Sequence, residues 1–201
     1  MHIEFLVEDL STHEALLQLL PKVLLSGTEY EIRSFRGKQD LFSNLPNRLQ
    51  GYRKWIPDDW KIVILLDCDN DNCTDLKNKL EMIALQSGFI TKTTRSSGQP
   101  FQILNRIMIE ELEAWFFGDV EALRTAYPGI SATLAQKSQY RDPDAIAGGT
   151  WEALERVLQR AGHHLGGLDK VKAAREISQY MNPEVNRSRS FQVFCTGLMT
   201  L

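Results

Sequence analysis

Short apolar runs and segments with apolar residues at helical spacing alternate along the first part of the chain. The runs that predict strands are 2–8, 30–35, 61–66, 89–94 and 101–109. The segments between them carry apolar residues three or four positions apart, as between Leu16 and Leu24, and these predict helices. Strands that alternate with helices are typical of an open, mostly parallel α/β sheet flanked by helices.

Local signals refine these elements. The run KIVILL at 61–66 does not alternate with polar residues, as expected of a central strand covered on both faces. Ser11 and Glu14 match a capping box, which predicts Ser11 as the N-cap of the first helix. Pro21 and Pro46 lie inside the first two helical patterns and predict kinks or interruptions there. A further helix is predicted to open at 110–117.

The pattern changes after Gly118. The later segments predicted to be helical are 119–127, 150–161, 168–180 and 188–201. The sequence therefore predicts an α/β domain over 1–118, followed by a helical C-terminal region over 119–201. That region either packs on the sheet as a separate unit or continues one domain.

Composition places the chain among ordinary soluble globular proteins, with 43% hydrophobic and 24% charged residues. A net charge of -3 gives no overall basic character, so any contact with nucleic acid has to come from local patches. No apolar run approaches the length of a membrane span. The apolar start of the chain is short and is interrupted by Glu4, unlike a signal peptide. We therefore expect a cytoplasmic protein without a membrane partner.

The cysteines add to that expectation. Cys68, Cys73 and Cys195 are odd in number and lack zinc-type spacing. We expect reduced thiols.

Chemistry is first suggested where the third apolar run ends, at KIVILLDCDNDNCTD (61–75). Asp67 and Asp69 follow the strand directly, and ligands of open α/β sheets bind beyond the carboxyl ends of the strands. Crowded carboxylates repel one another unless a cation neutralises them, and their hard oxygens suit Mg²⁺ or Mn²⁺. A divalent metal site is one interpretation of this stretch.

Other interpretations compete with the metal site. Asp71 or Asn72 could cap the next helix, with the other acids favouring its positive end. A calcium loop over 67–78 would need Gly where Asn72 stands and Glu where Asn78 stands. An aspartyl phosphotransferase would use Asp67 as nucleophile, although its motif usually follows the first strand.

The metal interpretation gains from a resemblance. Glu8 ends the first predicted strand, and an apolar run ending in Glu, with an apolar run ending in D-x-D two strands later, resembles the Toprim domain of topoisomerases, primases and related nucleases. The resemblance implies that Asp67 and Asp69 hold Mg²⁺ and that Glu8 binds metal or acts in acid/base catalysis. Asp9 stands where Toprim sequences commonly have Gly.

A second resemblance covers nearly the whole chain. The stretches that carry it are IEFLVED, FRGKQDL, GYRKWIPDDW, NRIMIEELEAWFFGD, YRDPDAIAGGTWEALERVL and NRSRSFQVF. They look like the domain-of-unknown-function family 4276, which is regarded as Toprim-like. Its members are often encoded beside ATPases of the AAA or ABC type in bacterial settings that suggest anti-phage defence. The resemblance implies an ATPase partner protein.

Further charged residues could complete a site. Glu111 and Glu113 follow the last predicted strand and could serve a second metal, or they could simply favour the start of a helix. Lys38, Arg187 and Arg189 could contact phosphate, although such side chains are often merely solvated. Buried-looking aromatics at 115–117 are expected in the core, and His163 and His164 in a loop.

Two functions follow as hypotheses. The first is a Mg²⁺- or Mn²⁺-dependent phosphodiester hydrolase, a nuclease acting on DNA or RNA, with Glu8, Asp67 and Asp69 at its centre. The second is a non-catalytic subunit that docks on an ATPase and transmits its state.

Overall fold

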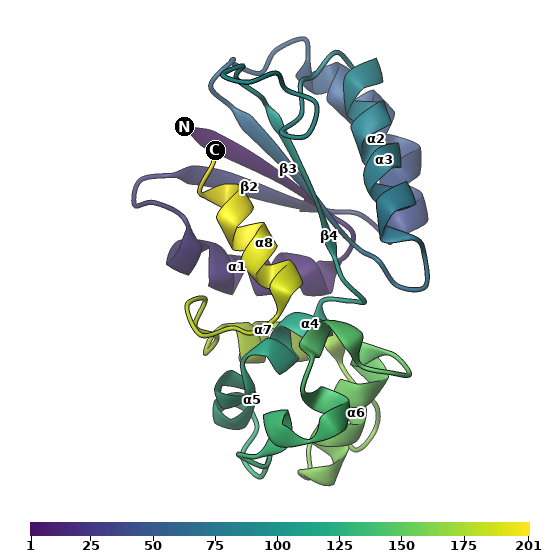
Figure 1. Cartoon of the computed structure of the whole chain (residues 1–201), viewed down its shortest axis with the longest axis vertical. Helices are drawn as coiled ribbons and strands as arrows, with labels where there is room; N and C mark the ends of the chain where they lie inside the picture. The colour runs from purple at the N-terminus through teal and green to yellow at the C-terminus, as the bar shows by residue number, and fades with distance from the viewer.

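A four-stranded sheet forms the centre of the protein, which we describe from a computed structural model covering residues 1–201. Its strands are β1 (His2–Val7), β2 (Glu29–Ser34), β3 (Lys61–Asp67) and β4 (Ile103–Met108). All pairings are parallel and the strand order is β2-β1-β3-β4 (Figure 1). The predicted α/β fold with a parallel sheet is confirmed.

Both faces of the sheet are covered. Helix α1 (Leu10–Val23) packs on one face, and α2 (Lys38–Tyr52) and α3 (Cys73–Gln86) pack on the other (Figure 1). In β3, Val63 and Leu65 belong to the core on the α1 face, whereas Ile62, Ile64 and Leu66 belong to the core beneath α2 and α3. Burial on both sides explains why this strand has no polar alternation.

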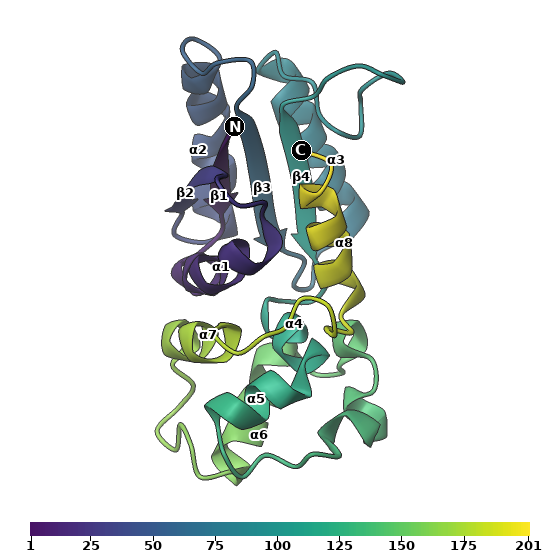
Figure 2. The ribbon, with the colours of Figure 1, turned by 90° about the vertical axis from the view of Figure 1, so that its left-hand side faces the viewer.

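Shorter helices gather at the carboxyl ends of the strands (Figure 2). They are α4 (Glu113–Gly118), α5 (Val120–Ala126), α6 (Thr150–Arg160), α7 (Lys170–Ser178) and three 3-10 turns, Leu134–Gln136, Ser138–Tyr140 and Pro143–Ala145. The last helix, α8 (Arg189–Leu198), returns to pack beside β4 on the same face as α1. One continuous core of 35 buried residues joins α1, α8 and the helices of the C-terminal half.

Several predicted elements are confirmed. The aromatic residues Trp115, Phe116 and Phe117 are buried in the core as expected, and His163 and His164 lie in a loop. By contrast, α1 and α2 continue through Pro21 and Pro46, so the prediction of an interruption at these prolines is wrong. No helix reaches the length and apolar character that crossing a membrane requires.

Other local predictions are wrong. Residues 89–94 form turns with a single bridge from Thr91 to Ile103 instead of a strand. The N-cap of α1 is Asp9, whose carboxylate accepts a hydrogen bond from Thr12 N at 2.8 Å, and Ser11 merely donates to Asp9. The helix expected at 110–117 begins only at Glu113, because Glu110 adopts a left-handed φ of 60° that no helix continues through.

The strand order positions the site. After β1 the chain crosses to one side to form β2 and then to the other side to form β3, so the connections diverge between β1 and β3. In open parallel sheets, this divergence leaves a crevice beyond the carboxyl ends of the two strands, where ligands bind. The residues that follow Val7 and Leu66 therefore face the expected ligand position.

Candidate functional site

Glu8 and Asp67 lie side by side at this divergence. Glu8 follows β1 directly and Asp67 is the last residue of β3. The carboxylate of Glu8 accepts hydrogen bonds from the backbone N–H of Asp67 and from that of Lys38, each at 3.1 Å. Glu8 thus joins the ends of β1 and β3 to the start of α2.

Gly37 makes this contact possible. Its φ of 94° is readily available only to glycine, and its N–H donates to the carbonyl of Glu8 at 3.0 Å. The tight turn brings the first residue of α2, Lys38, back towards the end of β1. The side chain of Lys38 then reaches across the carboxyl edge of the sheet.

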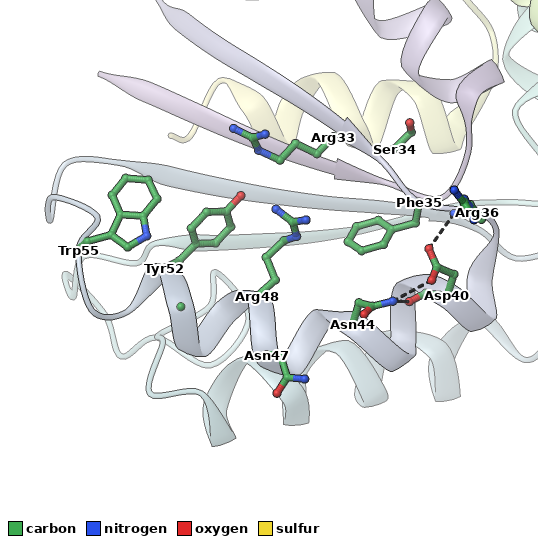
Figure 3. A pocket seen from close by; sticks show the side chains of 11 residues that line it. Arg33, Ser34, Phe35, Arg36, Asp40, Asn44, Asn47, Arg48, Tyr52 and Trp55 are labelled. Atoms are coloured by element: carbon green, nitrogen blue, oxygen red, sulfur yellow. Dashed lines mark hydrogen bonds between the residues drawn. The ribbon is translucent and has the colours of Figure 1, made fainter.

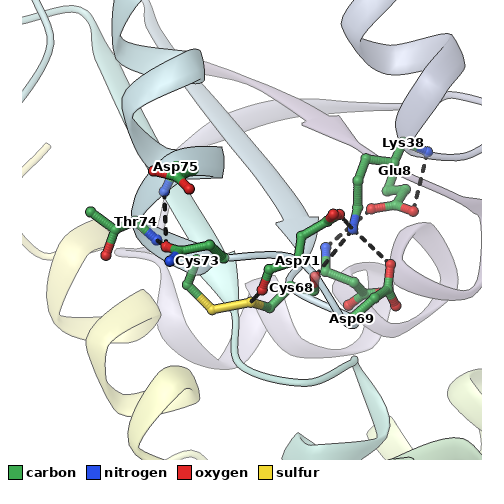
Figure 4. The surroundings of a disulfide bond; sticks show 10 residues. Glu8, Lys38, Cys68, Asp69, Asp71, Cys73, Thr74 and Asp75 are labelled. Carbon is green, nitrogen blue, oxygen red and sulfur yellow. Dashed lines mark hydrogen bonds and ion pairs between the residues drawn. A yellow bond between two sulfur atoms is a disulfide. The ribbon is translucent and has the colours of Figure 1, made fainter.

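The ammonium of Lys38 is the cation of this edge (Figure 4). Its Nζ donates to Asp69 Oδ2 and Asp71 Oδ2, each at 2.7 Å, and to the carbonyl of Cys68 at 3.2 Å. The sequence predicted Lys38 as a phosphate contact. In the structure its ammonium lies at the carboxyl edge of the sheet and forms ion pairs with Asp69 and Asp71.

The loop that carries Asp69 is tightly held. Asp69 adopts a left-handed φ of 49°, and its N–H donates to Glu110 O at 2.8 Å. A disulfide joins Cys68 to Cys73 across the loop (Figure 4), so the prediction of reduced thiols is wrong for these two cysteines. Spacing alone could not reveal the pair, because the loop has to fold back before the two sulfurs meet. Cys195 is free and buried.

The carboxyl group of Asp67 lacks an interaction that its buried position requires. Its Oδ1 is fully buried and has no hydrogen-bond partner. Burial raises the pKa of Asp67 well above its ordinary value, and the nearby carboxylates, Glu113 and Glu8 foremost, raise it further. Asp67 as a residue is only half-buried, but if ionised its carboxylate has no hydrogen-bond partner at Oδ1 and no ion pair with any basic side chain.

Burial also raises the pKa of two neighbouring carboxyls, although each of these has a lysine nearby. Burial raises the pKa of Glu8 to about 7, against hydrogen bonding from Asp67 N and the charge of Lys38, which lower it. Burial likewise raises the pKa of Glu113 to about 7, although the charge of Lys170 lowers it. Three neighbouring carboxyls thus resist ionisation for the same physical reason.

Glu111 and Glu113 lie on the neighbouring segment, as the sequence predicted, but they have different roles. Glu113 is only 2% exposed. Glu111 Oε2 accepts from Thr150 N, Thr150 Oγ1 and Trp151 N at 2.8–3.2 Å, so it serves as an acceptor for the start of α6. Glu113 is therefore the better candidate ligand of the two.

Lys170 is the residue that sequence reasoning missed. Its ammonium lies 3.7 Å from Glu111 and 3.8 Å from Glu113, above the ring of Trp151. It comes from α7, far along the chain, and an isolated lysine next to a helix start carries no signal. Asp9, which stands where Toprim sequences commonly have Gly, adds its negative charge to that around Asp67.

The two predicted C-terminal arginines lie outside this cluster. Both Nη atoms of Arg187 donate to backbone carbonyls, those of Arg141 and Phe117, at 3.0 and 3.2 Å. Arg189 is the first residue of α8, and its backbone N–H is bound by Asp144. A role in phosphate binding stays a prediction for both.

We refer to Glu8, Asp67, Asp69, Glu111 and Glu113 as the carboxyl-edge cluster. Its donors are hard carboxylates with an unpartnered buried oxygen, which fits a divalent cation in chemistry and in charge. No three His, Cys, Asp or Glu side chains lie close enough together in this conformation to share one metal ion. Binding a cation would therefore require side-chain rotation, most simply of Asp69 away from Lys38.

A cleft of about 650 Å³ opens beside the cluster. Asp69, Glu110 and Glu111 line one wall, and the loop before α6 and its first turn line the other, with Glu152. No basic side chain lines this cleft. A phosphate could enter it only together with cations.

Comparison with known proteins identifies the family. Neither the curated proteins nor the solved structures gave a match. A family model described as "Domain of unknown function (DUF4276)" matches residues 7–199, nearly the whole chain. The chain therefore belongs to the DUF4276 family.

Proposed function

We propose that the protein is a Mg²⁺- or Mn²⁺-dependent phosphodiester hydrolase of the Toprim type, acting as a nuclease. The observation that carries the proposal is the buried, unpartnered Oδ1 of Asp67 among carboxyls of raised pKa, at the point where the sheet connections diverge. Carboxyls whose pKa is raised by burial in such a crevice are candidates for a functional site.

The residues have distinct roles in this proposal. Asp67 and Glu8 bind the cation, and Asp69 joins them when its carboxylate leaves Lys38. The bound cation would neutralise the carboxyls and polarise a phosphodiester. The alternative role of Glu8 is that of general base: when it is not bound to the cation, its pKa of about 7 suits it to accept a proton from the attacking water near neutral pH.

Lys38 connects the cation site to the substrate. Its ammonium lies between Asp69 and Asp71, where it takes the place of an external cation. When Asp69 turns to the metal, Lys38 becomes free to contact a phosphate oxygen as a point charge. A second cation would use Glu113, with Lys170 displaced or retained as a neighbouring positive charge.

The test is a nuclease assay on DNA and RNA with Mn²⁺ or Mg²⁺, on the wild type and on Asp67→Asn. We expect cleavage by the wild type and a loss of at least about a hundredfold in Asp67→Asn, with the fold intact by circular dichroism. Asp75→Asn is the matched control, because Asp75 is exposed in the first turn of α3 and should leave cleavage unchanged. Equal activity in wild type and Asp67→Asn would exclude this proposal.

One observation favours the alternative, a non-catalytic subunit of an AAA- or ABC-type ATPase. Glu8 and Asp69 are already bound by protein donors, and no three carboxyls are gathered for a metal. The assay is therefore repeated with an ATPase encoded beside the gene. Cleavage only in the joint reaction would make the chain a nuclease that depends on its partner. No cleavage under any condition, with stable binding of the ATPase, would support the non-catalytic role.

A further inference from the structure

A second groove, on the opposite side of β1 from β3, differs in character from the acidic cleft. It lies between the edge strand β2 and helix α2 and has a volume of about 680 Å³. Its main polar and aromatic lining residues are Arg33, Arg36, Arg48, Asn44, Asn47 and Trp55. We refer to it as the arginine groove (Figure 3).

The arginine groove carries excess positive charge. Asp40 is the only acidic residue in its lining, and Asp40 already accepts hydrogen bonds from Arg36 N and from the Asn44 side chain at 3.0 and 2.7 Å. Arg33 pairs with Glu4 at 2.9 Å. Arg36 and Arg48 form no ion pair with any residue of the chain. Two guanidinium groups are thus available for an anionic ligand.

Arg48 gives an independent sign of an absent partner. Its Nε is fully buried and has no hydrogen-bond acceptor. The guanidinium lies over the ring of Phe35, 5.5 Å from its centroid, so stacking fixes its position in the groove. A buried donor without a partner is costly, and an anion in the groove would supply the acceptor.

Aromatic groups accompany these charges. Trp55 is 58% exposed, and it is held by edge contacts with Tyr52 and Trp60 at centroid distances of 5.7 and 5.5 Å. Figure 3 shows Trp55, Tyr52, Arg48, Phe35 and Arg36 in a row between β2 and α2. An exposed indole held in place by its neighbours offers a surface on which an unpaired base can stack.

The length of the groove fits several nucleotides. The row runs alongside α2, whose 15 residues span about 22 Å. Arg36 stands two residues before Lys38, whose backbone N–H is bound by Glu8, so one end of the groove leads to the carboxyl-edge cluster. A strand lying in the groove would therefore reach the acidic site at its end.

A peptide added to the sheet edge is the competing occupant. The outer edge of β2 is free to pair, but Glu29, Glu31 and Arg33 place charges along this six-residue strand. Charged residues on a short edge strand oppose the addition of another strand. Unpaired arginines beside an exposed tryptophan favour a phosphate chain with bases instead.

We propose that the arginine groove binds single-stranded nucleic acid, with Arg36 and Arg48 on phosphates and Trp55 stacked on a base. Binding itself does not depend on cleavage. Only the assignment of the bound strand as substrate rests on the proposed function, because the groove would guide it to the carboxyl-edge cluster.

The test is fluorescence anisotropy of labelled single-stranded DNA and RNA of about 12 nucleotides, measured in EDTA so that no metal is needed. The double variant Arg36→Glu/Arg48→Glu should bind at least tenfold more weakly. Its log–log salt dependence should become shallower by about 1.4, or about 0.7 for each lost phosphate contact. Trp55→Ala should weaken binding about tenfold with an unchanged salt slope.

The controls separate the groove from general charge. Arg156→Glu/Arg160→Glu makes the same charge change at two exposed positions of α6 and should leave the affinity within about twofold. Arg36→Glu alone covers the case in which changing the partly buried Arg48 disturbs folding. Asp67→Asn should bind like the wild type while losing cleavage. A wild type that binds the oligonucleotides in the groove but does not cleave them with Mn²⁺ or Mg²⁺ would count against the proposed function alone.

Three results would overturn the inference. One is the absence of single-strand binding by the wild type at low salt, and another is an equal loss in the α6 control. The third is retained oligonucleotide binding in the groove variants together with loss of a protein partner, which would make the groove a protein-docking surface.

Discussion

The carboxyl-edge cluster and the arginine groove lie on the two sides of the turn that joins β2 to α2. The first gathers negative charge and the second gathers positive charge. The cluster buries carboxyls against one another and offsets them with only Lys38 and Lys170. The groove leaves Arg36 and Arg48 without any ion pair. A net charge of -3 conceals this separation, because the two excesses largely cancel in the sum.

The comparison shows how burial changes the meaning of a charged cluster. The exposed Arg36 keeps its hydration and costs little when unpaired, and in the half-buried Arg48 only Nε lacks both water and a partner. Carboxyls that are buried together lose hydration and repel one another, so the fold pays in stability unless a proton or a cation is bound. The unpaired arginines identify the groove without any effect on stability. The buried carboxyls of the cluster should instead make the free energy of unfolding depend on pH and on divalent cations.

The largest expected effect is on the pH dependence of stability. Glu8 and Glu113 have an ordinary pKa of 4.5, and burial raises both to about 7 in the folded protein. Between these values the unfolded chain loses the protons first, so the free energy of unfolding should fall as pH rises from 5 to 8. Each of the two groups should contribute on the order of 3 kcal/mol, measured by urea denaturation.

Glu113→Gln should remove its share of this fall, and Glu121→Gln should not, because Glu121 is exposed on α5. Mn²⁺ at pH 8 should restore part of the lost stability of the wild type by binding the folded state. If the free energy of unfolding does not change between pH 5 and 8, the pKa values of Glu8 and Glu113 are not raised in the folded protein.

The next effect concerns Lys170. Replacing it by methionine leaves the buried carboxylate of Glu113 without its nearest cation. We expect Lys170→Met to lower the free energy of unfolding by about 2 kcal/mol at pH 8 and by less at pH 5.5, where Glu113 is protonated. Lys172→Met, on the same helix but exposed and 3.9 Å from its partner Glu176, should change it by less than about 0.5 kcal/mol.

The double variant Lys170→Met/Glu113→Gln should recover most of the loss at pH 8, since it removes the carboxylate that Lys170 neutralises. A similar loss in the single and double variants would mean that Lys170 stabilises the protein by packing its stem on Trp151 instead.

The sheet could be predicted because its signals are local. KIVILL reads as a buried strand from six consecutive residues, and the strand ends then place Glu8 and Asp67 at one edge by topology alone. The Glu8 carboxylate accepts a hydrogen bond from the backbone N–H of Asp67, so the ends of the two strands do lie together at this edge. The false strand at 89–94 shows the limit of such signals, because its residues are compatible with a strand but find only one bridge.

The remainder of both sites depends on contacts between distant segments. Lys170 reaches the cluster from α7 through the packing of that helix against α1 and α4. The arginine groove combines β2 with both ends of α2, and no sequence window contains Arg33, Arg48 and Trp55 in a recognisable pattern. The disulfide between Cys68 and Cys73 likewise needs the turn that Asp69 makes with a left-handed φ.

The smallest expected effect separates two arginines of the same groove. Arg36 is exposed and without an ion pair, so Arg36→Gln should change the free energy of unfolding by less than about 0.5 kcal/mol. Arg33 pairs with Glu4, which is 2% exposed, and Arg33→Gln should therefore cost about 1–2 kcal/mol. Urea denaturation at pH 7 measures both. If Arg36→Gln proves as costly as Arg33→Gln, Arg36 supports the fold, and it then cannot be counted among the groups that the groove keeps available for an anionic ligand.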